Sequence, residues 1–186
     1  MPKVIIVEGV DNCGKDTLIE NLKGHFNKTK VIHSSAPDSD NLFLFYYNGI
    51  IRDTLKEYYS KEYDAIIHNR SMYGEYVYGP KYRNEDKHKV MQMINRLELG
   101  RLKSFICEDE LYLVLLTSDN VDLLVNHDDG KSISNKCEDI LSEIKLFDEV
   151  FCNSTIRNKI RITVNDGNRF KPKEEICSEV IKFIEN

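Results

Sequence analysis

The chain contains 186 residues, of which 41% are hydrophobic and 31% are charged. This composition is typical of a single globular domain with its own core. Apolar stretches stay well below the ~20 residues of a membrane-spanning helix, so we expect no membrane partner. The formal net charge is −5 and no basic stripe is present, which argues against a nucleic-acid partner. The five cysteines lack a C-x-x-C spacing, and this favours reduced thiols in a cytoplasmic protein.

Short apolar runs alternate with longer amphipathic segments along the chain, which is the pattern of a parallel α/β sheet. It predicts one doubly wound domain over residues 1–186, with five strands and helices on both faces. The most continuous apolar run, at 112–116, is expected to be the central strand. In the segment 73–82, Gly79-Pro80 is predicted to break regular structure. The predicted strands are 4–7, 30–33, 64–68, 112–116 and 160–164, and the predicted helices are 15–26, 42–59, 90–102, 118–125, 140–151 and 176–184.

A glycine-bounded loop, Gly9-Val10-Asp11-Asn12-Cys13-Gly14-Lys15-Asp16-Thr17, links the first predicted strand to the first helix. Strand, loop and helix in this order are the context of a phosphate-binding P-loop. Loop N–H groups and the positive end of the helix dipole face the ligand, and Lys15 adds a mobile charge. The predicted nucleotide-binding residues are Asp11, Asn12, Cys13, Gly14, Lys15, Asp16 and Thr17.

The third predicted strand runs into Asn69-Arg70-Ser71, at the edge of the sheet where the P-loop also lies. Ligands of open parallel sheets bind beyond the carboxyl ends of the strands. Arg70 can hold a phosphate with two parallel hydrogen bonds, and the alternative for this residue is a structural ion pair. The sequence therefore predicts that Lys15 and Arg70 face the same phosphates.

These motifs resemble a known family. Glu8-Gly9-Val10-Asp11, followed by Gly14-Lys15 and Thr17-Leu18, is similar to the thymidylate kinase family of P-loop nucleoside monophosphate kinases. The stretch Gly74-Glu75-Tyr76-Val77-Tyr78-Gly79-Pro80-Lys81-Tyr82-Arg83 resembles phage-encoded members. The resemblance implies the nucleoside monophosphate kinase fold, Mg²⁺, and transfer of the γ-phosphate of ATP to a deoxynucleoside monophosphate, most of all dTMP. It also implies a homodimer.

The resemblance implies roles for further residues. Asp11 faces the acceptor nucleotide, near its sugar hydroxyl or the metal, unless it is only a solvated loop residue. A lid loop at about 127–133 closes over the phosphates, and Lys131 is its candidate electrophile in place of the family's arginine, with a merely solvated lysine as the alternative. The predicted catalytic residues are Lys15, Arg70, Asp11 and Lys131.

The acceptor side is predicted from aromatic and basic residues. Phe43 or Tyr47 could stack on the acceptor base, although core packing is the commoner fate of helical aromatics. Tyr78 and Arg83 belong to the segment that resembles phage-encoded enzymes. The predicted substrate-binding residues are Asp11, Phe43, Tyr47, Asn69, Arg70, Tyr78 and Arg83.

Two residues depart from the family pattern. Asp16 stands where a Ser or Thr usually follows the lysine, and Asn69 replaces the Asp of the strand-end Asp-Arg pair. Either Asp16 binds Mg²⁺ itself, or it turns away and Thr17 supplies the hydroxyl. The two changes could compensate, with Asp16 taking over the metal anchoring that Asn69 gave up. On this basis, Asn69→Asp is expected to preserve or raise activity.

Two alternatives stay open. A deoxynucleoside kinase shares the architecture but needs a carboxylate base for the sugar hydroxyl, which Asn69 cannot provide. A nucleotide-binding protein with weakened catalysis would also explain Asp16, Asn69 and a lid that lacks arginine.

Overall fold

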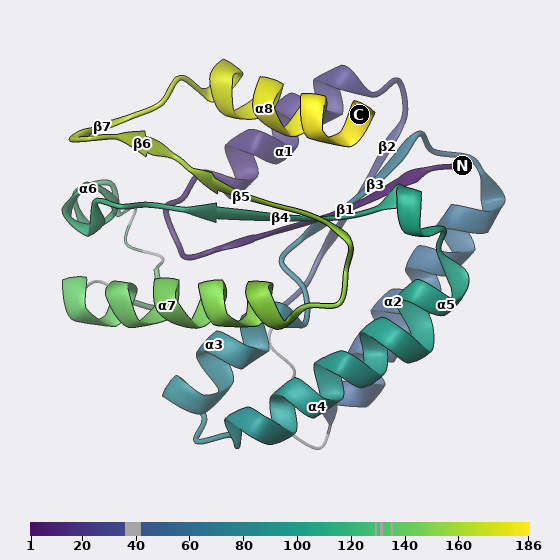
Figure 1. Cartoon of the computed structure of the whole chain (residues 1–186), viewed down its shortest axis with the longest axis horizontal. Helices are drawn as coiled ribbons and strands as arrows, with labels where there is room; N and C mark the ends of the chain where they lie inside the picture. The colour runs from purple at the N-terminus through teal and green to yellow at the C-terminus, as the bar shows by residue number, and fades with distance from the viewer. Residues whose placement is uncertain (36–41, 129, 131, 135) are drawn as a thin grey trace.

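The structure is a computed structural model that describes residues 1–35, 42–128, 130, 132–134 and 136–186. Five parallel strands form a sheet in the order β2-β3-β1-β4-β5 (Figure 1), so the predicted α/β architecture is confirmed. The strands are β1 (Lys3–Gly9), β2 (Thr29–His33), β3 (Ala65–Asn69), β4 (Leu111–Thr117) and β5 (Asn158–Thr163).

The central strand is β1, and the prediction that 112–116 is central was wrong. The fourth strand, β4, lies between β1 and β5, and all seven of its residues are buried. A continuous apolar run reports that both faces of a strand are covered. It does not report how many strands lie on each side, and for that reason it could not separate β4 from β1.

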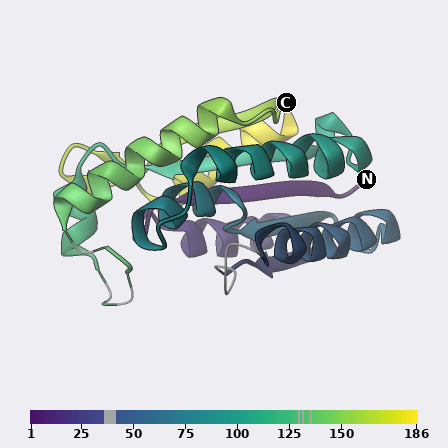
Figure 2. The ribbon, with the colours of Figure 1, turned by 90° about the horizontal axis from the view of Figure 1, so that it is seen from below.

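Helices cover both faces of the sheet. On one face α1 packs against α8, and on the other α3 packs against α7 (Figure 1). In Figure 2, α7 lies along one side of the molecule, followed by α4 and then α2, and α4 and α2 contact each other. The helices are α1 (Lys15–His25), α2 (Phe43–Ser60), α3 (Tyr73–Tyr82), α4 (Lys87–Leu97), α5 (Lys103–Phe105), α6 (Val121–Asn126), α7 (Cys137–Asn153) and α8 (Lys173–Glu185).

Three shorter elements complete the chain. A π-helical turn, Glu98–Leu102, joins α4 to α5, and a 3₁₀ turn, Glu108–Glu110, precedes β4. After β5, a small antiparallel hairpin is formed by β6 (Asn165–Asp166) and β7 (Arg169–Phe170). Among the described residues, no helix is both long enough and apolar enough to cross a membrane.

Local signals misplaced two boundaries. Residues 73–82 form α3 with Pro80 inside it, so Gly79-Pro80 does not break the segment. Pro80 lies in the last turn, where its missing N–H removes a single helical bond close to the end. The helix predicted from Ser118 begins at Val121 instead, because Asn120 rather than Ser118 is its N-cap and accepts from the backbone N–H of Leu123.

The register of the sheet sets the position of the functional residues. Val7 of β1 pairs with Asn69 of β3, and Asn69 pairs in turn with His33 of β2. Parallel pairing therefore brings the ends of β1, β2 and β3 to one edge, where the P-loop begins. The middle of β1 is fully buried, so this edge rests on a rigid core.

We expect Gly9→Ala to destabilise the fold by at least about 2 kcal/mol. The φ of Gly9 is +144°, and a Cβ there would overlap the backbone carbonyl oxygen of Leu116 on β4. Gly24→Ala, within α1, is the matched control. A Cβ at Gly24 meets no described atom within 4 Å, and Ala should stabilise this helix by about 0.5–1 kcal/mol. Urea unfolding of both variants checks the prediction, which fails if Gly9→Ala unfolds at the wild-type midpoint.

Candidate active site

The P-loop is shaped by two left-handed residues. Asn12 has φ 63° and Gly14 has φ 78°, and Gly14 is the N-cap of α1. No side chain among the described residues caps this helix end. The first N–H groups of α1 therefore remain free to meet an anion, together with the positive end of the helix dipole.

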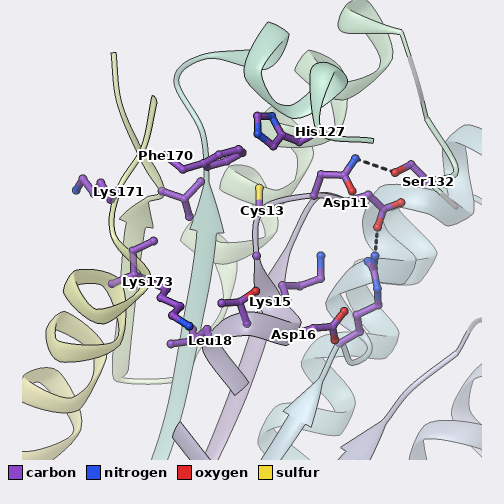
Figure 3. Close-up of a pocket in the computed structure, with 16 residues that line it drawn as sticks. Asp11, Cys13, Lys15, Asp16, Leu18, His127, Ser132, Phe170, Lys171 and Lys173 are labelled. Atoms are coloured by element: carbon purple, nitrogen blue, oxygen red, sulfur yellow. Dashed lines mark hydrogen bonds and ion pairs between the residues drawn. The ribbon is translucent and has the colours of Figure 1, made fainter. Parts of the chain in front are cut away.

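A cavity of about 620 Å³ opens at this helix end, within the usual range of nucleotide-sized pockets. It is lined by Arg70 and by all seven residues from Asp11 to Thr17. In Figure 3, Lys15 and Asp16 lie at one end of the cavity, and His127 and Phe170 lie at the other. The structure thus brings together the predicted P-loop residues and the strand-end arginine.

Lys15 is 7% exposed, and its amine donates to the backbone carbonyl oxygens of Gly9 (2.9 Å) and Val10 (2.7 Å). Burial, reinforced by the positive charge of Arg70, lowers the pKa of Lys15 from 10.5 to about 8. A negative ligand would reverse this effect, since an opposite charge stabilises the ammonium form.

Arg70 reaches the cavity from the end of β3. Its φ is 66°, an uncommon value for a residue with a side chain, and its backbone N–H donates to Val7 of β1 (3.1 Å). The guanidinium forms an ion pair with Asp11 and lies 5.7 Å from the ring centre of Tyr78. The ion pair foreseen as an alternative exists, but it lies inside the cavity rather than away from it.

Asp16 and Asn69, the two residues that depart from the family pattern, contact each other. The side-chain amide of Asn69 donates to Asp16 Oδ1 at 2.5 Å and lies 3.3 Å from Nδ1 of His33. Asp16 and Thr17 are both exposed in the first turn of α1. Asn69 does not line the cavity itself, but it fixes a carboxylate that does.

The loop after α6 contacts the P-loop. The amide of Asn12 donates to Ser132 Oγ (2.9 Å), and Asp11 Oδ2 accepts from the backbone N–H of Ile133 (3.1 Å). Part of the predicted lid thus rests on the P-loop residues that precede Lys15. Lys131, the predicted lid electrophile, lies outside the described residues.

No protein-family model matches the chain, and no curated protein matches it. Solved structures do. The YorR protein of Bacillus subtilis, in complex with phosphorylated GDP, aligns with a TM-score of 0.67 at 18% identity, over 98% of this chain and 95% of that one. Thymidylate kinase from Candida albicans aligns with a TM-score of 0.66 at 13% identity, over 99% and 91%.

The fold is that of the P-loop nucleoside monophosphate kinases. At these identities the likeness establishes the fold alone, and the resemblance to phage-encoded enzymes stays a prediction. Within this kinase fold, the cavity lies at the carboxyl ends of the strands, where open α/β sheets bind their ligands.

The kinase fold does not bring every predicted residue to the cavity. Phe43 is 1% exposed and packs in the core, so core packing replaces the predicted stacking role. Tyr47 is also buried and donates to Glu75 (3.1 Å). Arg83 is held by Glu75 and Glu85. Phe43 and Tyr47 lie on the face of α2 that packs against the core, and Arg83 directly follows α3. The periodicity of the sequence could not show how these two helices are oriented relative to the P-loop.

Sequence reasoning did not place Phe170 at the far end of the cavity. The rings of His127 and Phe170 meet edge to face with centroids 4.7 Å apart. Phe170 follows β5 through the β6–β7 hairpin, so its chain position gave no hint that it returns to the P-loop. The cavity is further lined by Leu18, Val164, Lys171, Lys173 and Ile176.

The strand that leads into the P-loop carries a buried carboxyl group. Glu8 is 1% exposed, and its Oε1 accepts from the backbone N–H (2.7 Å) and the hydroxyl (2.8 Å) of Ser71. Among the described residues, no donor reaches its Oε2. Burial raises the pKa of Glu8 from 4.5 to about 7, although the charge of Arg70 opposes this rise.

This pKa predicts how stability depends on pH. Because the folded pKa of about 7 exceeds 4.5, the folded state favours the protonated carboxyl. Its stabilising contribution is complete below pH 4.5 and is lost as the pH rises through about 7. Relative to Glu8→Gln, the wild type should lose about 2–3 kcal/mol of unfolding free energy between roughly pH 5 and pH 8. Other titrating groups act equally in both proteins, so parallel stability curves would contradict the prediction.

Proposed function

We propose that this protein is an ATP-dependent kinase that transfers the γ-phosphate to a nucleoside monophosphate and forms the diphosphate. One observation carries the proposal: Lys15 and Arg70, from separate strand ends, line the same cavity at an uncapped helix N-terminus. Phosphoryl transfer depends mainly on positioning and on neutralising charge, and this arrangement offers both. The solved structures with this fold include a thymidylate kinase, which supports the same reading.

The P-loop side would hold the donor. The free N–H groups at the start of α1 would bind the β-phosphate, and Lys15 would exchange two backbone carbonyls for phosphate oxygens. Arg70 would bind the transferring phosphate with two parallel hydrogen bonds once Asp11 releases it. Charge that develops on the phosphate would then be stabilised from both sides.

The acceptor would be a monophosphate, with dTMP favoured by the resemblance of the P-loop to thymidylate kinases. A nucleoside acceptor would need a carboxylate base at the strand end. Asn69 stands there instead, while Asp16 is bonded to Asn69 and Asp11 is paired with Arg70. A monophosphate acceptor has less need of such a base, so it fits this set of residues better.

Mg²⁺ fits the residues at the start of α1. Asp16 and Thr17 supply a carboxylate and a hydroxyl, both of them oxygen donors that Mg²⁺ prefers. Within the described residues, no group of three or more His, Cys, Asp or Glu side chains could hold a metal. This agrees with an ion bound by one or two side chains together with phosphates and waters. When bound, Mg²⁺ would neutralise charge on the phosphates.

A homodimer, a cytoplasmic location and the lid role of Lys131 remain proposals from the sequence. The same holds for Tyr78 and Arg83 as acceptor-binding residues. The ring centre of Tyr78 lies 5.7 Å from the guanidinium of Arg70, close enough for Tyr78 to contribute to acceptor binding. Arg83 would first have to leave Glu75 and Glu85.

The proposed function is tested by incubating the protein with ATP, Mg²⁺ and a panel of nucleosides and nucleoside monophosphates while ADP release is followed. We expect turnover with monophosphates, and dTMP should be among the best. Turnover with nucleosides alone would select the deoxynucleoside kinase. ATP binding without turnover on any acceptor would leave only a nucleotide-binding protein. Lys15→Ala serves as the inactive control.

The Asp16–Asn69 contact generates a second prediction. In Asn69→Asp two carboxylates would meet, and like charges in contact oppose each other. This reverses the expectation from sequence alone, and turnover should now fall about 10-fold at near-neutral pH. The double variant Asp16→Ser/Asn69→Asp, which has a single carboxylate at these positions, should recover most of that loss.

Kinetics of the two single variants and the double variant form a double-mutant cycle that measures this coupling. Asn27→Asp, at an exposed position just after the C-cap of α1, adds the same charge away from the cavity and serves as the control. Unfolding in the absence of Mg²⁺ provides a readout that does not depend on activity. Additive effects in both measurements would show that Asp16 and Asn69 act independently.

A further inference from the structure

Glu8 holds the residue that follows Arg70. A single oxygen of its carboxyl group accepts both the backbone N–H and the hydroxyl of Ser71. Glu8 is the next-to-last residue of β1, and Ser71 is the second residue after β3, so this pair joins the two strands beyond their last ladder pair, Val7 with Asn69. The same junction includes the hydrogen bond from the Arg70 N–H to Val7.

Arg70 lies between these two attachments with its backbone in the left-handed region. Such a conformation is strained for a residue with a side chain, and it persists only when the surrounding structure holds it. Here one attachment precedes the Arg70 Cα and the other follows it. Without the second, the backbone could relax to negative φ, and the guanidinium would turn away from Asp11.

The contacts of Glu8 are an unfavourable way to stabilise the fold alone. A buried carboxyl group is costly unless its oxygens are hydrogen-bonded, and no described donor reaches Oε2. Glu98 differs from Glu8 in this respect. One of its oxygens accepts from the backbone N–H and the hydroxyl of Thr155, as Glu8 does from Ser71, but its other oxygen accepts from the hydroxyl of Tyr73 (2.6 Å). Glu8 is thus the less satisfied of two similar buried carboxyl groups, and it is the one that lies within reach of the charges of Arg70 and Lys15.

We propose that Glu8 is a positioning residue, which holds Arg70 in its left-handed conformation through Ser71 and thereby aims the guanidinium at the phosphates. The inference rests on the proposed function, since it assigns Glu8 to the arginine of that site. Glu8 itself touches no substrate in this scheme. Its contribution reaches the phosphates only through Arg70.

The experiment compares Glu8→Ala and Glu8→Gln with the wild type in steady-state kinetics and in calorimetry of dTMP binding. Glu8→Ala should lower kcat/KM for the monophosphate by about 100-fold, as small misplacements of a catalytic group do. The Kd for ATP should rise by much less than kcat/KM falls, because the amine of Lys15 and the loop amides would still hold phosphates that Arg70 does not. Glu8→Gln keeps an oxygen for Ser71 and should restore most of the loss.

Glu98→Ala is the matched control. This variant removes the same kind of buried hydrogen bonds, from the N–H and hydroxyl of Thr155, and should lower Tm. It should leave kcat/KM within about two-fold of the wild type. If Glu8→Ala does not fold, Ser71→Ala removes one of the two hydrogen bonds and should give a smaller loss in the same direction. A change in stability alone would not lower kcat/KM in Glu8→Ala while leaving it near the wild-type value in Glu98→Ala.

The decisive comparison uses Arg70→Ala. If Glu8 acts through Arg70, then Glu8→Ala or Ser71→Ala should cause no further loss of kcat/KM on the Arg70→Ala background. A further loss of the full size would overturn the inference, as would wild-type kinetics in Glu8→Ala. Wild-type protein that turns over no acceptor at all would instead overturn the proposed function, so the two failures are distinguishable.

Discussion

The parallel pairing of β1 with β3 is the constraint on which the site depends. It sets the end of β3 beside the start of the P-loop, and it places Arg70 opposite Asp11. The hydrogen bonds from Arg70 to Val7 and from Ser71 to Glu8 continue the strand junction past the ladder. A rigid core beneath an edge of the sheet thus holds charged groups that would not gather on their own.

The charged groups around the cavity are held by partners within the protein. The amine of Lys15 rests on backbone carbonyls, and burial lowers its pKa to about 8. Arg70 is paired with Asp11, which also holds the backbone of Ile133 in the lid loop. An incoming phosphate would compete for these partners, so binding at the P-loop and contact with the lid share the same groups.

Local patterns predicted much of the fold. Hydrophobic periodicity identified the strands of the sheet and the main helices, because a buried strand and an amphipathic helix each record their surroundings in a few successive residues. The glycine spacing from Gly9 to Gly14 predicted the P-loop for the same reason. Pro80 and Ser118 misled, because breaking and capping tendencies are weak preferences that the packing of α3 and the side chain of Asn120 overrode.

By itself, the sequence determined the order of the elements, the P-loop and the two departures at Asp16 and Asn69, because each is a property of neighbouring residues. Only the tertiary structure decided which groups meet. The amide of Asn69 reaches Asp16 across 53 positions, and Arg70 reaches Asp11 across 59. Contacts over such separations depend on strand register and helix orientation. The residue pattern of a single segment does not reveal how that segment is placed against another. For Glu8, too, the role emerged only once β1 and β3 lay side by side.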